Sequence, residues 1–380
     1  MNYLWFKLIL ALILIWPRGY LLVYVIDRAK NFDFGFKFFA GWIFGLAAFT
    51  IDLFSANVFG GFKLNPWLFY FSVISQVFGL EMVIFLFERK FLWPKFENAG
   101  TFFFRQKNNF LNWSKNEYLI LVILALSFLV SGIFIWQVNA NSAADNSAQL
   151  IFNAKTISLA EIGLKNYPLN DSLAQVWLGV VAGRFTADYS KFLVIFYYFI
   201  ILAVFYTSLP KKISRFAKLL SVYFLSNLPL LFFYFGATAV DWVFAIFLFL
   251  TLANFFYYLT GRGNSFFYFS GIAMAFSVWT RNDGLVLIFP LFVLATLVLL
   301  LIKKIKLSQW LLFWFWPVVT VSSWLSFIFA NHLNIFRIYF ADFSFADLRG
   351  IIAGFLPLIF LFLALFFIKI FGKINLYGKS

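Results

Sequence analysis

Cysteine is absent from the 380 residues of this sequence, and histidine occurs once, at His332. A chain without cysteine forms no disulfide and offers no thiol for chemistry. A single histidine also excludes metal sites that are built from several imidazole ligands. Any chemistry of this chain must therefore come from other residue types.

Charged residues are scarce as well. They make up 12% of the chain, whereas hydrophobic residues make up 63% and the mean hydropathy is +0.90. Soluble domains contain about a quarter charged residues. Apolar runs of roughly 17 to 25 residues recur along the chain, which is the length that a helix needs to cross a bilayer. The 60 phenylalanines lie in continuous runs that do not alternate with polar residues, which argues against a β-barrel. The sequence predicts an all-α, polytopic bundle of transmembrane helices.

Acidic residues are half as frequent as basic ones, so the formal net charge is +15. The basic residues gather in short loops, as in cytoplasmic loops of membrane proteins. They form no basic face with interleaved aromatic residues, which argues against nucleic acid as a partner. The expected environment of the chain is the lipid bilayer. The basic clusters that we expect in the cytoplasm lie in 88–117, 210–218, 303–306 and 369–379.

About eleven spans are expected from the apolar runs. They cover about 4–26, 38–59, 66–87, 118–138, 189–209, 219–235, 242–260, 266–280, 285–302, 310–330 and 350–371. The positive clusters agree with this order only if 172–185, which is short for a crossing, does not cross. Residues 139–188 then form an outer loop region with small helices, the N-terminus lies outside and the C-terminus inside. If 172–185 does cross, one basic cluster must lie outside.

The first apolar run has no small-residue cleavage site, so we expect a retained span and not a cleaved signal peptide. Within it, Trp16–Pro17–Arg18 suggests a kink or an early end of the span. Asp52 and Glu81 lie inside the second and third expected spans. Intramembrane acids are functional candidates, but a structural pair with each other or with an interfacial lysine is an equal alternative. Their expected depths, toward opposite faces, argue against a direct pair.

Polar residues at the outer ends of spans are the stronger candidates. Asp241, Arg281 and Asp283 lie directly beside span ends and not in long loops. The stretch SVWTRNDGLVLIFP, residues 277–290, interrupts two apolar runs with an arginine and an aspartate. Such residues are costly near hydrocarbon, so they mark either a water-facing turn or a site.

Three motifs resemble GT-C glycosyltransferases of the protein-mannosyltransferase-like kind. In 145–185, Asp145 takes the place of the loop Asp of that family, Lys155 that of the second Lys of a Lys-Ala-Lys turn, and Tyr167 begins the Tyr-Pro-Leu segment. Asp241 matches an Asp that opens a helix after a small-residue turn. The segment WTRNDG resembles the Trp-Thr-Lys/Arg-Asn-Glu-Gly turn of the family. Three positions depart from the family pattern, namely Ala144, Asn153 and Asp283, where Trp, Lys and Glu are usual.

The resemblance implies transfer of a sugar from a polyprenyl phosphate to a lipid, glycan or protein acceptor at the outer face of the plasma membrane. Asp145 would then be the catalytic base, and Arg281 and Lys155 would bind the donor phosphate. Asp241, Asp283 and Tyr167 would support them, with Asp283 orienting Arg281. No cofactor or metal ligand is assigned, and dependence on a divalent metal is left open.

The predicted organisation follows from this resemblance. Residues 1–117 form an N-terminal three-span segment of unknown role, 118–302 the GT-C-like core with the outer loop 139–188, and 303–380 a two-span C-terminal segment. The alternatives are a transporter of lipid-linked substrates, for which inverted repeats would be expected, and a non-catalytic membrane scaffold.

Overall fold

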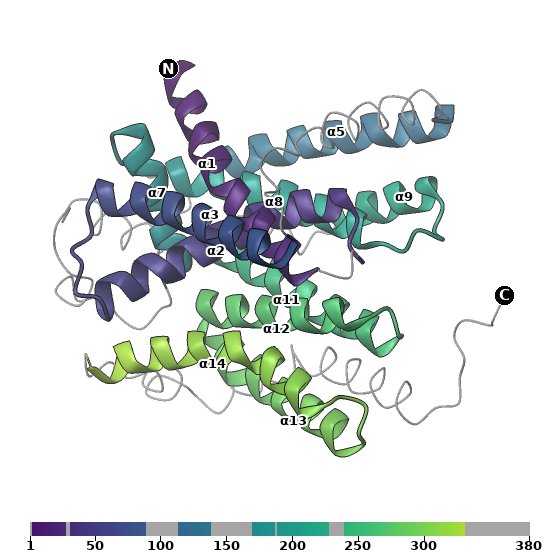
Figure 1. Cartoon of the computed structure of the whole chain (residues 1–380). Helices are drawn as coiled ribbons and strands as arrows, with labels where there is room; N and C mark the ends of the chain where they lie inside the picture. Colours follow the sequence, from purple (N-terminus) through teal and green to yellow (C-terminus); the bar gives the residue numbers. More distant parts are fainter. Residues whose placement is uncertain are drawn as a thin grey trace, which may run out of the picture. The chain divides into compact units, whose positions relative to one another are not determined.

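The fold is known from a computed structural model that describes residues 2–27, 31–88, 113–137, 169–186, 188–227 and 239–330 (Figure 1). Within these ranges the chain consists of helices joined by turns, with no strand, which confirms the predicted all-α class. The helices are α1 (Asn2–Ile26), α2 (Phe34–Val58), α3 (Pro66–Glu88), α5 (Lys115–Gln137), α7 (Asn170–Ala182), α8 (Asp188–Ser208), α9 (Arg215–Ser226), α11 (Ala239–Leu259), α12 (Asn264–Thr280), the π-helix η2 (Gly284–Ile288), α13 (Phe289–Leu301) and α14 (Leu307–Ala330).

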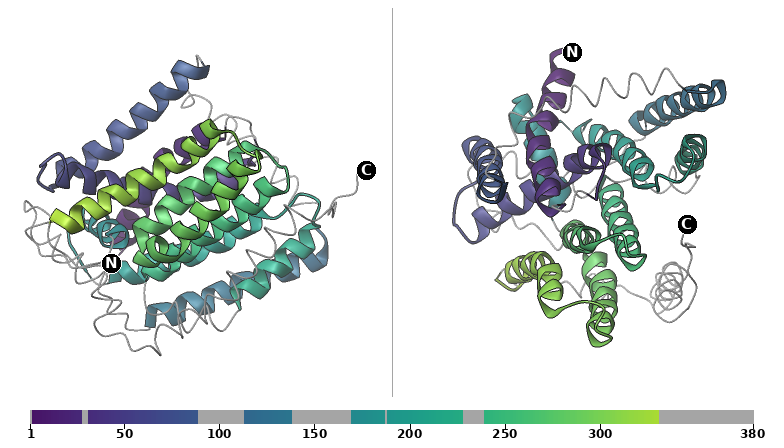
Figure 2. Two further views of the ribbon diagram at one scale, coloured as in Figure 1. Left: turned by 90° about the horizontal axis from the view of Figure 1, so that it is seen from below. Right: turned by 45° about the vertical axis from the view of Figure 1, so that its right-hand side comes forward.

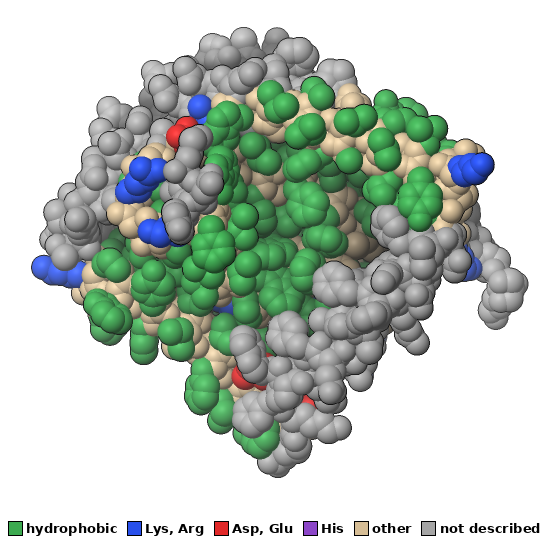
Figure 3. Space-filling view, turned by 90° about the horizontal axis from the view of Figure 1, so that it is seen from above, with side chains coloured by type: hydrophobic (Ala, Val, Ile, Leu, Met, Phe, Trp, Pro, Cys, Tyr) green, Lys and Arg blue, Asp and Glu red, His purple; other side chains and the backbone are tan. Residues whose placement is uncertain are grey.

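Eight helices in the described ranges are long and apolar enough to cross a membrane. They cover Trp5–Ile26, Phe34–Val58, Pro66–Glu88, Lys115–Ile133, Lys191–Ser208, Val240–Leu259, Gly284–Leu301 and Leu307–Phe329. In Figure 3, most of the described side chains that face the viewer are hydrophobic, and Lys and Arg are few. Many large hydrophobic side chains of the described helices are exposed, which fits a lipid environment because a soluble monomer rarely exposes large apolar patches. The chain is a multi-pass helical membrane protein.

The described helices match most of the expected spans. Helix α1 runs through Pro17 to Ile26, in agreement with the expected span 4–26, so of the two suggestions made for Trp16–Pro17–Arg18 the early end does not occur. Helix α9 ends at Ser226 after 12 residues and does not extend over the expected span 219–235. Helix α12 has 17 residues, slightly fewer than a typical span, and contains the whole expected span 266–280. The expected span 350–371 lies outside the described residues.

Capping residues explain where two helices begin beside the basic loops. Ser114 and Glu117 form a reciprocal capping box at the start of α5, in which each side chain accepts a hydrogen bond from the backbone of the other. Ser214 caps α9 by accepting a hydrogen bond from the backbone N–H of Ala217. These starts are readable in the sequence because they depend on neighbours along the chain.

The described residues divide into two compact units, and the division falls within α11, between Val243 and Phe244. The first unit contains α2, α3, α5, α7, α8, α9 and nearly all of α1, and the second contains most of α11 and the helices that follow it. The predicted organisation, with limits at 117 and 302, divides the chain by expected function and not by packing, so it stays a prediction.

In the first unit, α1 and α2 cross at very short range. A Cβ atom at Gly45 would lie 2.7 Å from the carbonyl oxygen of Ile15, and one at Gly41 would lie 2.9 Å from the backbone nitrogen of Tyr20. Gly19 of α1 meets Gly41 and Gly45 from the other side. The spacing of Gly41 and Gly45 is the small-xxx-small pattern that lets membrane helices approach closely. This crossing determines where the polar residues of α1 and α2 lie.

Helix α7 falls in the expected outer loop region with small helices, and it is buried within the first unit, which the sequence did not predict. Trp177 donates its indole N–H to the carbonyl of Ala11, 2.9 Å away, and its ring lies against Phe49 at a centroid distance of 5.2 Å. With 13 residues the helix is about 20 Å long, which is too short for a crossing, as the sequence indicated. It ends at Gly183, whose φ of 78° is the left-handed conformation that favours glycine.

In the second unit, α12 packs along α14, and α13 lies beside them (Figure 2). Thr296 of α13 accepts hydrogen bonds from the indole N–H groups of Trp310 and Trp314, at 3.2 and 3.0 Å. Gly271 of α12 permits close contact, because a Cβ there would lie 2.6 Å from the carbonyl oxygen of Phe313. The interior around these helices is apolar and aromatic.

Candidate functional site

The turn between α12 and α13 carries the two charged residues of SVWTRNDGL. Arg281 follows α12 in an extended conformation, with φ −146° and ψ 145°, and so interrupts the helix. The backbone N–H of Gly284 bonds to the carbonyl of Arg281 at 3.0 Å and closes a tight turn. The π-helix η2 begins at Gly284 and leads into α13. π-helical turns often occur at functional sites, and this one lies directly beside the charged residues.

The side chains of Arg281 and Asp283 form an ion pair, with 2.7 Å between Nη2 and Oδ2. Arg281 also lies over the ring of Phe244, 5.8 Å from its centroid, within the range of a cation–π interaction. The exposed fractions of the two charged side chains are 29% and 14%, so both are largely withdrawn from solvent. The expected orientation of Arg281 by Asp283 is present, while its role toward a phosphate stays a prediction.

The residues around this pair make the turn rigid. Asn282 is buried and accepts a hydrogen bond from the indole N–H of Trp324 at 3.0 Å, which ties the turn to α14. A Cβ at Gly284 would lie 2.8 Å from the carbonyl group of Ser277. Glycine is therefore required there for close approach to the last turn of α12. The turn presents Arg281 from a fixed backbone.

The other predicted site residues are placed less completely. Asp241 lies in the first turn of α11, where a carboxylate interacts favourably with the helix N-terminus. It belongs to the first compact unit, whereas Arg281 and Asp283 belong to the second. The predicted base Asp145, the predicted phosphate ligand Lys155 and the supporting residue Tyr167 lie outside the described residues. Their roles stay predictions.

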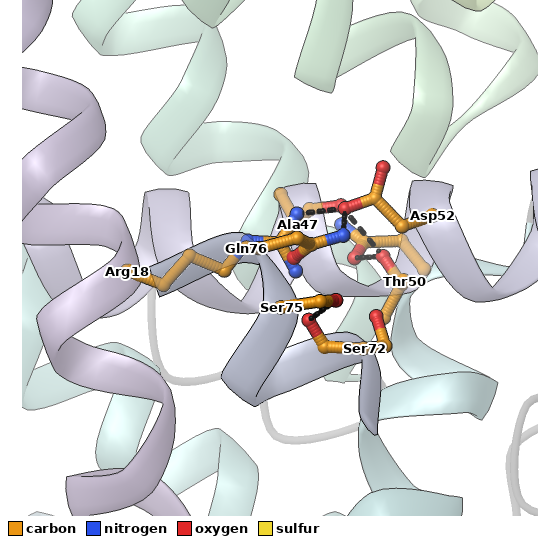
Figure 4. Close-up of polar contacts among 8 residues, drawn as sticks. Arg18, Ala47, Thr50, Asp52, Ser72, Ser75 and Gln76 are labelled. Atoms are coloured by element: carbon orange, nitrogen blue, oxygen red, sulfur yellow. Dashed lines mark hydrogen bonds and ion pairs between the residues drawn. The ribbon is translucent and has the colours of Figure 1, made fainter. Parts of the chain in front are cut away.

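A second polar cluster lies in the first unit, within three candidate spans (Figure 4). Arg18 of α1 forms an ion pair with Asp52 of α2, and the amide of Gln76 of α3 donates to the same carboxylate oxygen, Oδ2. The Arg18 side chain is 5% exposed and that of Asp52 is 40% exposed. Asp52 was recognised as a candidate from the sequence, but its partners were not. The available signal was an arginine within a long apolar run.

A further polar contact connects α2 and α7 close to this cluster. Thr50 of α2 donates to the side-chain oxygen of Asn170 of α7 at 2.8 Å, whereas Gln175 donates to Asp171 at 2.9 Å within α7 itself. All four residues are buried. Because buried polar groups are costly unless they are hydrogen-bonded, the bond between Thr50 and Asn170 helps to position α7 against α2.

Metal ligands do not gather in the part of the chain that the structure describes. Those residues contain no group of three or more His, Cys, Asp or Glu side chains that could hold an ion. The carboxylates of Asp52 and Asp283 instead bind arginine. The arrangement on both units therefore offers oriented guanidinium groups and hydrogen-bond acceptors.

Comparison with known proteins does not extend this description. No family model, curated protein or solved structure matches the chain. The fold by itself defines a helical, multi-pass membrane protein with one polar cluster in each of its two units.

Proposed function

We propose that this chain is an integral membrane glycosyltransferase, which moves a sugar from a polyprenyl-phosphate donor to a lipid, glycan or protein acceptor on the outer face of the plasma membrane. The observation that carries the proposal is the turn at Arg281, where a guanidinium is held by Asp283 at the end of an apolar helix. Its support from the sequence is the resemblance of three motifs to GT-C enzymes.

The chemistry requires a cation that holds a phosphate leaving group. Arginine binds phosphate through paired hydrogen bonds. Its guanidinium has five N–H donors, so one ion pair with Asp283 does not exhaust its capacity. Asp283 restricts the side chain of Arg281 to one orientation, which lowers the entropy lost when a phosphate binds. Lys155 would add a second positive charge.

The reaction is a displacement at the anomeric carbon of the sugar. The acceptor hydroxyl oxygen forms a bond to that carbon, and the bond from the carbon to the phosphate oxygen breaks. The electron pair leaves with the lipid phosphate, which Arg281 and Lys155 stabilise. The hydroxyl proton passes to the carboxylate of Asp145, the proposed general base. Asp241 and Tyr167 are proposed to support the loop that holds the base.

The test is transfer of radiolabelled sugar from polyprenyl-phosphate donors to extracted lipids by the purified chain. Asp145→Asn should abolish transfer while the protein remains folded and inserted, because an amide cannot accept the proton. Arg281→Ala should also lose transfer. Arg262→Ala is the matched control, because Arg262 lies before the other end of α12 and also contacts a ring, that of Tyr257 at 4.1 Å. Full activity of both Asp145→Asn and Arg281→Ala would exclude the mechanism.

A second candidate function is transport of a lipid-linked substrate across the membrane. The observation that favours it is the Arg18–Asp52 pair within candidate spans, since ionisable groups there often line substrate paths. Proteoliposomes with a fluorescent polyprenyl-linked sugar separate the two functions. A transporter moves the label between leaflets without an acceptor, whereas a transferase needs the acceptor and releases lipid phosphate.

A further inference from the structure

The hydrogen-bonding capacity of the Arg18–Asp52–Gln76 cluster is only partly used among the described residues. Both donors converge on Oδ2 of Asp52. In Figure 4 the other carboxylate oxygen of Asp52 points away from Arg18 and Gln76. Within the described chain, Nη1 of Arg18 and Oε1 of Gln76 are buried and make no hydrogen bond. The cluster therefore offers one buried donor and two acceptors beyond its internal contacts.

Unsatisfied buried groups are costly, and more so when they belong to a charged side chain. Arg18 is 4% exposed, so its Nη1 cannot turn to solvent without a large rearrangement. In native proteins such atoms are usually paired with another protein group or with a bound molecule, water included. A group that both donates and accepts hydrogen bonds would satisfy all three atoms.

The charge of the cluster restricts the chemistry of that group. Arg18 and Asp52 carry opposite charges, so the three residues have no net charge. The most exposed polar group is a carboxylate, which repels phosphate, while the nearby guanidinium opposes a second cation. A ligand with several adjacent hydroxyl groups fits the cluster better than a charged one, because each hydroxyl is one donor and also an acceptor.

The depth of the cluster points to a lipid-borne ligand. Asp52 lies six residues before the end of α2 at Val58, roughly 9 Å along the helix axis. Gln76 lies near the middle of the candidate span Pro66–Glu88. A headgroup attached to a lipid is held in the bilayer by its tail and can enter laterally between helices; it loses its water on entry, and the polar atoms of the cluster replace those hydrogen bonds.

We infer that the Arg18–Asp52–Gln76 cluster binds a neutral, hydroxyl-bearing lipid headgroup, such as that of a glycolipid. Hydroxyls donate to Asp52 and Gln76, and Arg18 donates to a hydroxyl oxygen. This inference goes beyond the proposed function and does not rest on it, because it involves neither Arg281 nor the outer loop. A chain without transferase activity would still bind such a headgroup here.

The experiment uses the full chain in phosphatidylcholine nanodiscs and photoreactive alkyl probes of one chain length. The probes carry a glucoside, a phosphate or a trimethylammonium headgroup, and labelled peptides are identified by mass spectrometry. The glucoside probe should label peptides of α1, α2 and α3 in a saturable way. Excess unlabelled alkyl glucoside should compete, whereas the same concentration of free glucose should not.

Two variants test whether the cluster is the site. Gln76→Leu keeps the ion pair and should weaken glucoside labelling at least about fivefold, near the factor expected for one lost hydrogen bond. The double variant Arg18→Met/Asp52→Leu removes both charges, so it leaves no unpaired ion and should still fold. It should abolish saturable labelling. Ser75→Ala is the control, because Ser75 neighbours Gln76 on α3 and its hydroxyl donates to the carbonyl of Ser72, outside the cluster.

The outcomes that would overturn the inference are distinct. Equal glucoside labelling of the parent and the double variant would show that the cluster is not the site. Labelling by the phosphate or ammonium probe as strong as by the glucoside would show that neutral hydroxyl chemistry is not selected. Absence of saturable labelling would leave water as the only occupant, and competition by free glucose would assign the site to a water-borne sugar.

Discussion

Arg18 of α1 and Asp52 of α2 form an ion pair inside two candidate membrane spans, although 34 residues separate them in the chain. The crossing of α1 and α2 at Gly41 and Gly45 brings the two helices close enough for this contact. The long side chain of Arg18 spans the remaining distance to the carboxylate of Asp52 (Figure 4).

Removing one partner of this pair should be much more harmful than removing both. Asp52→Leu leaves the guanidinium of Arg18 buried without its carboxylate, which costs about 3–5 kcal/mol. The double variant Arg18→Met/Asp52→Leu leaves no buried charge and should recover most of the lost stability. Thermal unfolding in a defined detergent, monitored through the yield of monodisperse protein, measures the stability difference between the single and the double variant. Equal losses of stability in the single and double variants would show that Arg18 and Asp52 do not stabilise the protein through their mutual contact.

The helix crossing predicts opposite effects for two glycine substitutions. Gly45→Ala places a Cβ against the backbone of Ile15 and should destabilise the protein by roughly 1–3 kcal/mol, since overpacked positions cost that much. Gly79→Ala in α3 is the control, because a Cβ at Gly79 meets no atom within 4 Å. Alanine favours helix over glycine by about 0.5–1 kcal/mol, so the control should be neutral or slightly stabilised. Unfolding midpoints under identical conditions give the comparison, and a tolerated Gly45→Ala would contradict the close crossing.

Arg281 should show a graded response if it binds the donor phosphate. Arg281→Lys keeps the charge but loses the paired hydrogen bonds, and Arg281→Ala loses both. Hydrogen bonds to charged groups contribute roughly 1.5–3 kcal/mol, which is on the order of ten- to a hundredfold in donor affinity. Binding of a non-hydrolysable polyprenyl phosphate should therefore decrease in the order Arg, Lys, Ala. Unchanged lipid-phosphate binding by Arg281→Ala would make Arg281 an interfacial anchor.

The predicted topology can be tested by labelling, because the chain has no native cysteine. Ser142→Cys in the predicted outer loop should react with a membrane-impermeant thiol reagent added outside intact cells. Lys212→Cys, in the exposed turn before α9, should react only after the membrane is opened. Lys212 is chosen over the nearby Ser214 in the same loop, because the hydroxyl of Ser214 caps α9 and its replacement would disturb the helix start. Labelling of both positions from outside would reject the arrangement.

Local sequence signals predicted the fold class and several helix limits well. Hydropathy indicated α3 to within one residue and the end of α2 equally well, although α2 begins four residues before the expected span. The spacing of Ser114 and Glu117 explains the start of α5. These features depend only on neighbours along one chain segment. The first span was expected to run through Pro17, and α1 does so, because packing of the whole helix outweighs one lost backbone hydrogen bond.

The candidate site was less predictable. The pair of Arg281 and Asp283 could be expected, because two oppositely charged residues in one short turn are close enough for their side chains to meet. The contact of Arg18 with Asp52 and Gln76 depends on which faces of three helices meet, and hydropathy does not determine that. The burial of α7 was missed for the same reason, since its apolar character fits either an outer surface or a packed interior.

The π-helix η2 sets the rotational phase of α13. Its backbone bond from Phe289 to Gly284 spans five residues, so η2 contains one residue more than an α-helical turn would. One added residue rotates everything beyond it by about 100° around the helix axis. Thr296 meets Trp310 and Trp314 only in the present phase. A single-residue deletion in 284–288 would restore a regular α-helix and turn Thr296 away from both tryptophans. The length of this short segment therefore aligns the end of the Arg281 turn with the packing of α13 on α14.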